Sequence, residues 1–190
     1  MAKRVCPFWI GYLLISPLRT LFQNPDKLLK PFINPGMKVL DIGCGMGFFS
    51  IPLARMIGAN GKVICVDVQE KMIKALKKRA KKAGLTDRIE TRICNQTSLD
   101  LYDLNEEIDF ALAFAVVHEV QYATEFFDEI YRTLKLPGRF LIVEPKGHVS
   151  EKDFNITTSL AQQNGFELID TPSLPRNRTM LLKKLIPHKK

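Results

Sequence analysis

The chain has 190 residues, of which 46% are hydrophobic and 25% are charged. At roughly 150 residues per domain, this length excludes two full catalytic domains, and the composition excludes a disordered or fibrous chain. The net charge of +8 suits nucleic acid, an anionic membrane surface or an acidic substrate as a partner, so the distribution of the charge has to decide among them.

An apolar run from Val5 to Ile15, preceded by two basic residues, lies near the start of the sequence. It has the length of a signal-peptide core, but no small-residue cleavage site follows, and a membrane span needs roughly 20 apolar residues. We therefore predict that residues 1–36 form an apolar helical or lid-like extension on a domain that covers residues 37–190. A peripheral membrane contact by this segment is the less favoured alternative.

From residue 37 onward, short β-rich apolar runs alternate with longer helical patterns, which indicates a parallel sheet covered by helices. The predicted strands are 38–42, 62–67, 88–94, 108–116, 138–144, 166–170 and 179–185. The predicted helices are 47–58, 69–83, 122–136 and 150–164. These elements predict an α/β fold of the doubly wound class, with a seven-stranded, mostly parallel sheet and helices on both faces.

The first predicted strand runs directly into three glycines at alternate positions, Gly43, Gly45 and Gly47. Glycine lets the backbone turn sharply and approach a ligand closely. In an open α/β sheet, ligands bind beyond the carboxyl ends of the strands, and the helix that follows directs free N–H groups toward that place. The loop therefore predicts a nucleotide-like ligand.

An acidic residue, Asp67, ends the second predicted strand 20 residues after Gly47. A carboxylate there can accept hydrogen bonds from both hydroxyl groups of a ribose, in nicotinamide and in adenosyl sites alike. The dinucleotide fingerprint requires a glycine where this chain has Phe48. A nicotinamide cofactor is therefore disfavoured.

Four motifs occur in order along the chain: Asp41 before the glycine loop, Val66-Asp67, Ile108-Asp109-Phe110, and the stretch from Leu134 to Arg139. Together they resemble the class I S-adenosylmethionine-dependent methyltransferases, and the resemblance covers residues 37–185. It implies a Rossmann-like methyltransferase fold, S-adenosylmethionine as the cofactor, and methyl transfer as the reaction.

By this resemblance, Asp41 and the glycine loop hold the methionine part of the cofactor, and Asp67 holds the ribose. The further cofactor contacts that it implies are Val68, Asn95, Gln96 and Phe114. The family often has an aspartate near the adenine amino group, where this chain has Asn95, whose amide oxygen can also accept a hydrogen bond. An equal alternative is that Asn95 only caps its loop.

Candidate catalytic residues follow the fourth and fifth predicted strands, where His118, Glu144 and His148 stand. Methyl transfer to a neutral hydroxyl or an acidic carbon is helped by a general base, typically by about 10²–10⁴-fold. The alternative for either histidine alone is a structural role at the start of the next helix. A metal held by these three residues is disfavoured, and no metal is predicted.

Three functions compete. The favoured one is a methyltransferase with a small-molecule or lipid-like acceptor at a carbon, oxygen or sulfur atom, because the cover ahead of residue 37 is short and apolar. An RNA methyltransferase is the alternative suggested by the basic residues near the C-terminus, which are Arg176, Arg178, Lys183, Lys184, Lys189 and Lys190. A non-catalytic adenosyl-binding partner protein is the third, although the glycines and Asp67 are intact.

The four cysteines lie far apart, with no CxxC pair. A disulfide framework or a zinc site is therefore not expected. Free thiols suit a reducing compartment, which predicts a cytoplasmic protein.

Overall fold

The computed structural model describes residues 23–185. Most of the predicted extension over residues 1–36 lies outside this range. Within it, helix α3 (Pro25–Leu29) follows Asn24, whose side-chain oxygen accepts a hydrogen bond from the backbone N–H of Lys27 at 3.1 Å. This is the usual way to satisfy a free donor at a helix start. The chain contains two compact units, which meet in sequence between Cys94 and Asn95.

The strands are β1 (Lys38–Ile42), β2 (Lys62–Asp67), β3 (Ile89–Ile93), β4 (Ile108–Phe114), β5 (Leu134–Pro145), β6 (Phe166–Asp170) and β7 (Asn177–Lys184). Their order is β3-β2-β1-β4-β5-β7-β6 in one seven-stranded sheet. Strand β7 pairs antiparallel with both β5 and β6, whereas β1 with β2, β2 with β3 and β4 with β5 pair in parallel. The prediction of a doubly wound, mostly parallel α/β fold is confirmed.

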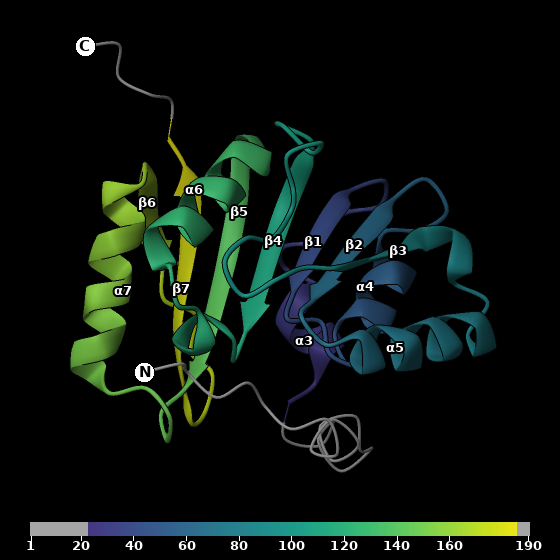
Figure 1. Ribbon diagram of the computed structural model, residues 1–190, viewed down its shortest axis with the longest axis horizontal. Helices are drawn as coiled ribbons and strands as arrows, with labels where there is room; N and C mark the ends of the chain where they lie inside the picture. The colour runs from purple at the N-terminus through teal and green to yellow at the C-terminus, as the bar shows by residue number, and fades with distance from the viewer. Residues whose placement is uncertain (1–22, 186–190) are drawn as a thin grey trace. The chain divides into compact units, whose positions relative to one another are not determined.

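The N-terminal unit contains strands β1 to β3 with helices α4 (Ser50–Met56) and α5 (Glu70–Lys82), which lie alongside β2 and β3 (Figure 1). Strands β1 and β2 are buried along almost their whole length, as in a parallel sheet that is covered on its faces. Helix α5 buries a stripe of Met72, Ile73, Leu76 and Ala80. This stripe has the helical spacing that the sequence predicts.

The C-terminal unit contains β4 to β7, with helix α6 (Ala123–Thr133) and helix α7 (Glu151–Gln163). Helix α7 packs on β6 and β7 and touches α6. Its first turn is capped by Ser150, which accepts a hydrogen bond from the backbone N–H of Asp153 at 3.1 Å. Phe127, Phe140 and Phe166 are buried with their ring centroids 6.0 to 6.3 Å apart, and they form the aromatic core of this unit.

Several predicted boundaries differ from the structure. Strand β5 begins at Leu134 and not at residue 138, and β7 begins at Asn177 and not at residue 179. Helix α6 ends at Thr133, not at residue 136, because Leu134 already pairs with Ile108 and begins β5. Helix α4 begins at Ser50, not at residue 47, because the glycine loop includes the left-handed residue Gly47. Strand β4 ends at Phe114, not at residue 116, because the next residue also has a positive φ.

The helices of residues 23–185 include none that is long and apolar enough to cross a membrane.

Candidate active site

The glycine loop leaves β1 and turns through three residues with positive φ, at 65° for Gly43, 52° for Gly45 and 83° for Gly47. Side chains with a Cβ rarely adopt this conformation. The backbone N–H groups of Gly43 and Cys44 donate to the carbonyl oxygen of Val66 at 2.8 and 3.1 Å, which fastens the loop to the neighbouring strand β2. The backbone of the loop is therefore held to β2 by hydrogen bonds, and its three left-handed residues are all glycines.

Asp67, the last residue of β2, joins this loop to the start of helix α5. Its Oδ2 accepts a hydrogen bond from the N–H of Gly45 at 2.9 Å, and its Oδ1 accepts one from the N–H of Gln69 at 2.8 Å. The side chain is 8% exposed. Burial raises the pKa of this carboxyl group above its ordinary value, while the two backbone hydrogen bonds oppose that shift.

Asp41 lies deeper, on β1, with 2% of its surface exposed. Its Oδ2 accepts a hydrogen bond from Ser50 Oγ at 2.5 Å, which links the strand to the first residue of α4. Burial, and to a smaller extent the charge of Asp67, raises the pKa of Asp41 to about 7 against the hydrogen bond from Ser50. The observed contact of Asp41 links β1 to α4, and direct contact with the cofactor is still a prediction.

The N-terminal unit fits an adenosyl cofactor. A Cβ added at Gly45 would meet nothing within 4 Å, whereas one at Gly47 would lie 2.3 Å from Leu76 Cδ1. There is thus space beside the backbone at Gly45, whereas the backbone at Gly47 packs directly against Leu76 of α5. Asp67, a buried carboxylate that ends the adjacent strand, has oxygens of the kind that accept hydrogen bonds from sugar hydroxyl groups, and its contact with a ribose is still a prediction. Val68, which follows it, is half-buried.

A contact that the sequence did not indicate supports the loop. Arg79 Nη1, from α5, donates a hydrogen bond to the carbonyl oxygen of Met46. The side chain is half-buried, and burial lowers the pKa of its guanidinium group. The sequence places Arg79 in a run of lysines, so it is expected on a solvated face. Its one distinguishing signal is that it is the single arginine of α5.

The three other predicted cofactor contacts lie in the C-terminal unit. Asn95 Oδ1 accepts hydrogen bonds from the N–H and the hydroxyl of Thr97 and from the N–H of Ser98, at 2.7 to 2.8 Å. This is the loop-capping alternative, and an adenine contact by Asn95 is still a prediction. The side chain of Gln96, which is exposed, accepts from Gln121 at 3.2 Å. Phe114 is buried at the end of β4.

The three candidate catalytic residues come together in the C-terminal unit. Glu144 is 2% exposed on β5, and its Oε2 lies 2.5 Å from His118 Nδ1. His118 belongs to the 3-10 turn η2 (Val117–Glu119) after β4, and its side chain is 23% exposed. The ring of His148, an exposed residue after β5, lies edge-on to that of His118 with 5.5 Å between the centroids.

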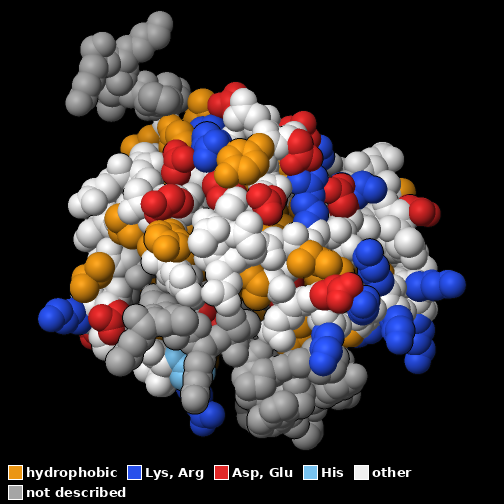
Figure 2. Space-filling model, viewed as in Figure 1, with side chains coloured by type: hydrophobic (Ala, Val, Ile, Leu, Met, Phe, Trp, Pro, Cys, Tyr) orange, Lys and Arg blue, Asp and Glu red, His pale blue; other side chains and the backbone are white. Residues whose placement is uncertain are grey.

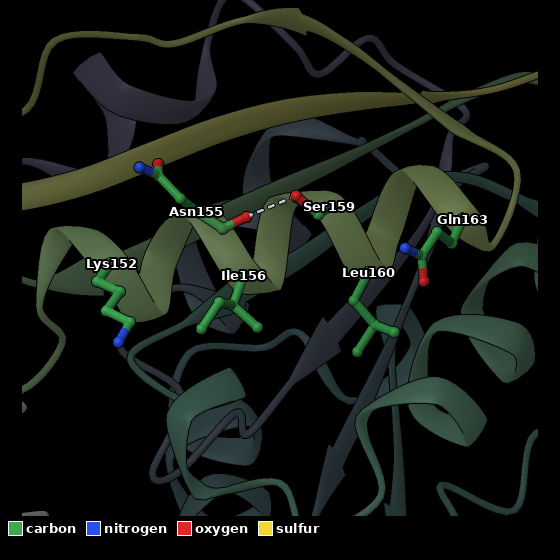
Figure 3. A pocket seen from close by; sticks show the side chains of 6 residues that line it. All are labelled: Lys152, Asn155, Ile156, Ser159, Leu160 and Gln163. Carbon is green, nitrogen blue, oxygen red and sulfur yellow. Dashed lines mark hydrogen bonds between the residues drawn. The ribbon is translucent and has the colours of Figure 1, made fainter.

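A shallow hollow lies along helix α7 (Figure 3). Its six lining residues all belong to this one helix: Lys152, Asn155, Ile156, Ser159, Leu160 and Gln163. Ser159 Oγ donates to the carbonyl oxygen of Asn155 at 3.0 Å, which is a hydrogen bond within the helix. Lys152 is the one ionisable side chain among these six residues.

Among residues 23–185, no group of three or more histidine, cysteine or acidic side chains is arranged to hold a metal ion.

A family model described as a methyltransferase domain matches residues 33–181. The chain belongs to this family, and its fold and glycine loop are those of an S-adenosylmethionine-dependent methyltransferase domain. A crystal structure of a SAM-dependent methyltransferase from Aquifex aeolicus has the same fold, with a TM-score of 0.85 at 24% identity over 95% of this chain and 100% of that chain.

Two curated relatives differ in what their names say they modify. A demethylmenaquinone methyltransferase of Symbiobacterium thermophilum is 31% identical over 111 residues, which are 58% of this chain and 43% of the relative. A 23S rRNA (uracil(1939)-C(5))-methyltransferase of Acinetobacter baumannii is 43% identical over 53 residues, which are 28% of this chain and 12% of the relative. The chain thus spans less than half of either protein.

Proposed function

We propose that this methyltransferase domain transfers the methyl group of S-adenosylmethionine to a carbon, oxygen or sulfur atom of a small-molecule or lipid-like acceptor. The observation that carries the proposal is the buried Glu144 carboxylate, which holds the His118 ring at the carboxyl ends of β4 and β5. Ligands of open α/β sheets bind beyond this edge. The similarity to a demethylmenaquinone methyltransferase over 58% of the chain also supports an acceptor of this class.

The cofactor residues of the proposal are Asp41, Gly43, Gly45, Gly47 and Asp67. When bound, the cofactor supplies an electrophilic methyl group. The loop glycines let the backbone approach it, and the Asp67 carboxylate accepts hydrogen bonds from its ribose. Val68, Asn95, Gln96 and Phe114 complete the proposed contacts, and His118, Glu144 and His148 are the proposed acceptor-side residues.

The basic residues near the C-terminus support the small-molecule acceptor over RNA, because two of them have structural roles. Lys184 is buried, and its Nζ donates to the carbonyl oxygen of Leu134 at 2.8 Å. Arg178 is half-buried and donates from Nε to the carbonyl oxygen of Val149 at 3.2 Å. Lysines gather instead over α5 at the right of Figure 2, without interleaved aromatic residues that would stack on bases.

The remaining parts of the proposal concern the whole protein. Residues 37–190 would act as the S-adenosylmethionine-binding domain, and residues 1–36, which include the apolar run from Val5 to Ile15, would cover the acceptor or touch a membrane surface. Cys44, Cys65 and Cys94 are free thiols. They suit the reducing environment of the cytoplasm.

The test is transfer of labelled methyl from S-adenosylmethionine into a cell extract, which is then separated into lipid, soluble small molecules, protein and RNA. We expect label in the lipid or small-molecule fraction. Asp67→Ala is the control, since it removes both acceptor oxygens and should weaken S-adenosylhomocysteine binding and abolish the label. Label that appears equally with this variant, or in none of the fractions, would contradict the proposal.

RNA is the alternative acceptor that one observation favours, namely the 43% identity to an rRNA methyltransferase over 53 residues. Label that is lost on ribonuclease treatment would establish it. Because basic side chains would then contact phosphates, that transfer should also fall steeply with salt concentration.

A further inference from the structure

Both oxygens of the buried Glu144 carboxylate are engaged by the turn that follows β4. Oε1 accepts a hydrogen bond from the backbone N–H of Val117 at 2.7 Å, and Oε2 lies 2.5 Å from Nδ1 of His118. The parallel pairing of β4 with β5, in which Phe114 is opposite Val143, brings the two strand ends together. One carboxylate therefore fixes both the backbone and the side chain of this turn.

The backbone at the end of β4 is bent so that these contacts form. Ala115 has a φ of 56°, a region that residues with a Cβ seldom occupy. Its N–H donates to the carbonyl oxygen of Val143 at 2.7 Å, which holds the bend against β5. Residues with strained backbone angles often occur at functional sites. The bend here aims the N–H of Val117 and the ring of His118 at Glu144.

The chemistry of the pair determines where His118 carries its proton. An ionised carboxylate only accepts hydrogen bonds, so Nδ1 must be the donor. In the neutral ring, the lone pair is then on Nε2. We propose that Glu144 fixes this tautomer, that His118 Nε2 is the general base of methyl transfer, and that the acceptor is consequently a hydroxyl, an enol or a carbon acid, which loses a proton when it is methylated. This inference rests on the proposed function and narrows its acceptor class.

The proposed step conserves atoms and charge. The acceptor atom forms a bond to the methyl carbon, the electron pair of the broken carbon–sulfur bond returns to the sulfonium sulfur, and the acceptor proton moves to His118 Nε2. The resulting imidazolium is stabilised by the Glu144 carboxylate, which stays ionised, as in other histidine–carboxylate pairs. Deprotonation to solvent restores the base. Glu144 is thus a positioning residue, and His118 is the catalytic one.

Among the described residues, Glu144 on β5 and His148 in the turn after β5 lie beside the His118 ring, and Glu119 is the next residue in η2. A positive charge on His148 would disfavour the charged form of His118, and the carboxylates would favour it. A pH profile alone would therefore mix several ionisations. For this reason the tautomer of His118 is the primary measurement.

The chain has three histidines, so ¹⁵N-histidine labelling gives a spectrum that His148→Asn and His188→Asn can assign. We expect the neutral His118 to carry its proton on Nδ1. In Glu144→Gln, one amide oxygen serves the N–H of Val117, and the amide NH₂ faces Nδ1, so the proton should move to Nε2. Lys146→Gln, an exposed change in the neighbouring turn, should keep the native tautomer. Protonation of Nε2 in the unmodified protein would overturn the proposal.

The second measurement uses an organic and aqueous small-molecule extract of cells as the methyl acceptor. We expect His118→Asn and Glu144→Gln to lower transfer of labelled methyl by about 10²–10⁴-fold, with S-adenosylhomocysteine affinity unchanged. A purely structural role of Glu144 would instead lower stability and leave the rate of the folded fraction intact, which would overturn the base assignment.

The charge of the labelled product tests the acceptor class. Methylation of a hydroxyl, an enol or a carbon acid gives a product without a new permanent charge, whereas methylation of a thioether or a tertiary amine gives a cation. We expect the label to pass through a cation-exchange resin at high pH. Retention on the resin would overturn the acceptor class. Absence of label from the extract would refute the proposed function itself, and the tautomer would then be judged by the ¹⁵N spectra alone.

Discussion

The buried carboxyl group of Asp41 should make the protein less stable as the pH rises. Its pKa is about 7 in the folded state, against an ordinary value of 3.8. Between these two values the folded protein holds a proton that the unfolded chain has lost, so the free energy of unfolding falls with increasing pH. The stabilisation is complete below the unfolded pKa and is lost as the pH passes through 7.

The size of the effect follows from the two pKa values. Each unit of pKa difference corresponds to about 1.4 kcal/mol. Between pH 5 and the folded-state pKa of about 7, the folded protein holds a proton that the unfolded chain lacks, over about two pH units. Asp41 alone should therefore lower the free energy of unfolding by about 2.5 kcal/mol over this interval.

Asp41→Asn removes the ionisation while retaining an oxygen that can accept from Ser50. Urea unfolding of both proteins at pH 5 and pH 8 gives the change in unfolding free energy over the interval. We expect the unmodified protein to lose about 2.5 kcal/mol more than the variant. Because each protein is compared with itself at the two pH values, any effect of the amide on stability that does not depend on pH cancels.

Asp87→Asn, at an exposed position, is the matched control and should leave the pH dependence unchanged. If Asp41→Asn had the same pH dependence as the unmodified protein, burial would not be raising the pKa of this group.

Further predictions concern single buried contacts. Gly45→Ala and Gly47→Ala each place a Cβ on a residue with positive φ, which should lower the free energy of unfolding by about 1–2 kcal/mol. At Gly47 the new Cβ would also overlap the side chain of Leu76. Thermal unfolding should show Gly47→Ala to be less stable by a further ~1–3 kcal/mol, and equal midpoints would contradict this. Glu129→Leu should lower stability by about 1–3 kcal/mol in urea unfolding, because it leaves the buried Leu99 N–H unpaired. Glu129→Gln keeps an acceptor, and an equal loss in both would refute the hydrogen-bond argument.

The strands that the sequence predicts best are those with abrupt ends. β1, β2 and β6 have the predicted bounds, because β-rich apolar runs end there at glycine or aspartate. The start of β5 is different. Residues 134–136 continue the helical pattern of α6, but Leu134 pairs with Ile108 on β4. A long-range strand pairing overrides the local preference here, and the sequence window contains no sign of it.

The cofactor loop was accessible to prediction because its parts are local. The glycines carry their conformational requirement in their own identity, and Asp67 ends a recognisable strand. The sequence does not predict that Ser50 bonds to Asp41 or that Arg79 bonds to the loop at Met46. Both depend on where a helix packs against the loop, and a serine or an arginine in a helix has many ordinary explanations.

The acceptor-side residues, in contrast, depend on long-range contacts that the sequence does not reveal. His118 and Glu144 are separated by 26 residues in sequence, so their contact depends on the register of β4 with β5 and on the bend at Ala115. Sequence reasoning could place each residue after a strand, but it could not tell a helix-starting histidine from one held by a carboxylate. The hydrogen bond to Nδ1 makes that distinction, since a carboxylate partner leaves the lone pair on Nε2. The base assignment is thereby reduced to the position of one proton on His118, which ¹⁵N spectra can test without knowledge of the acceptor.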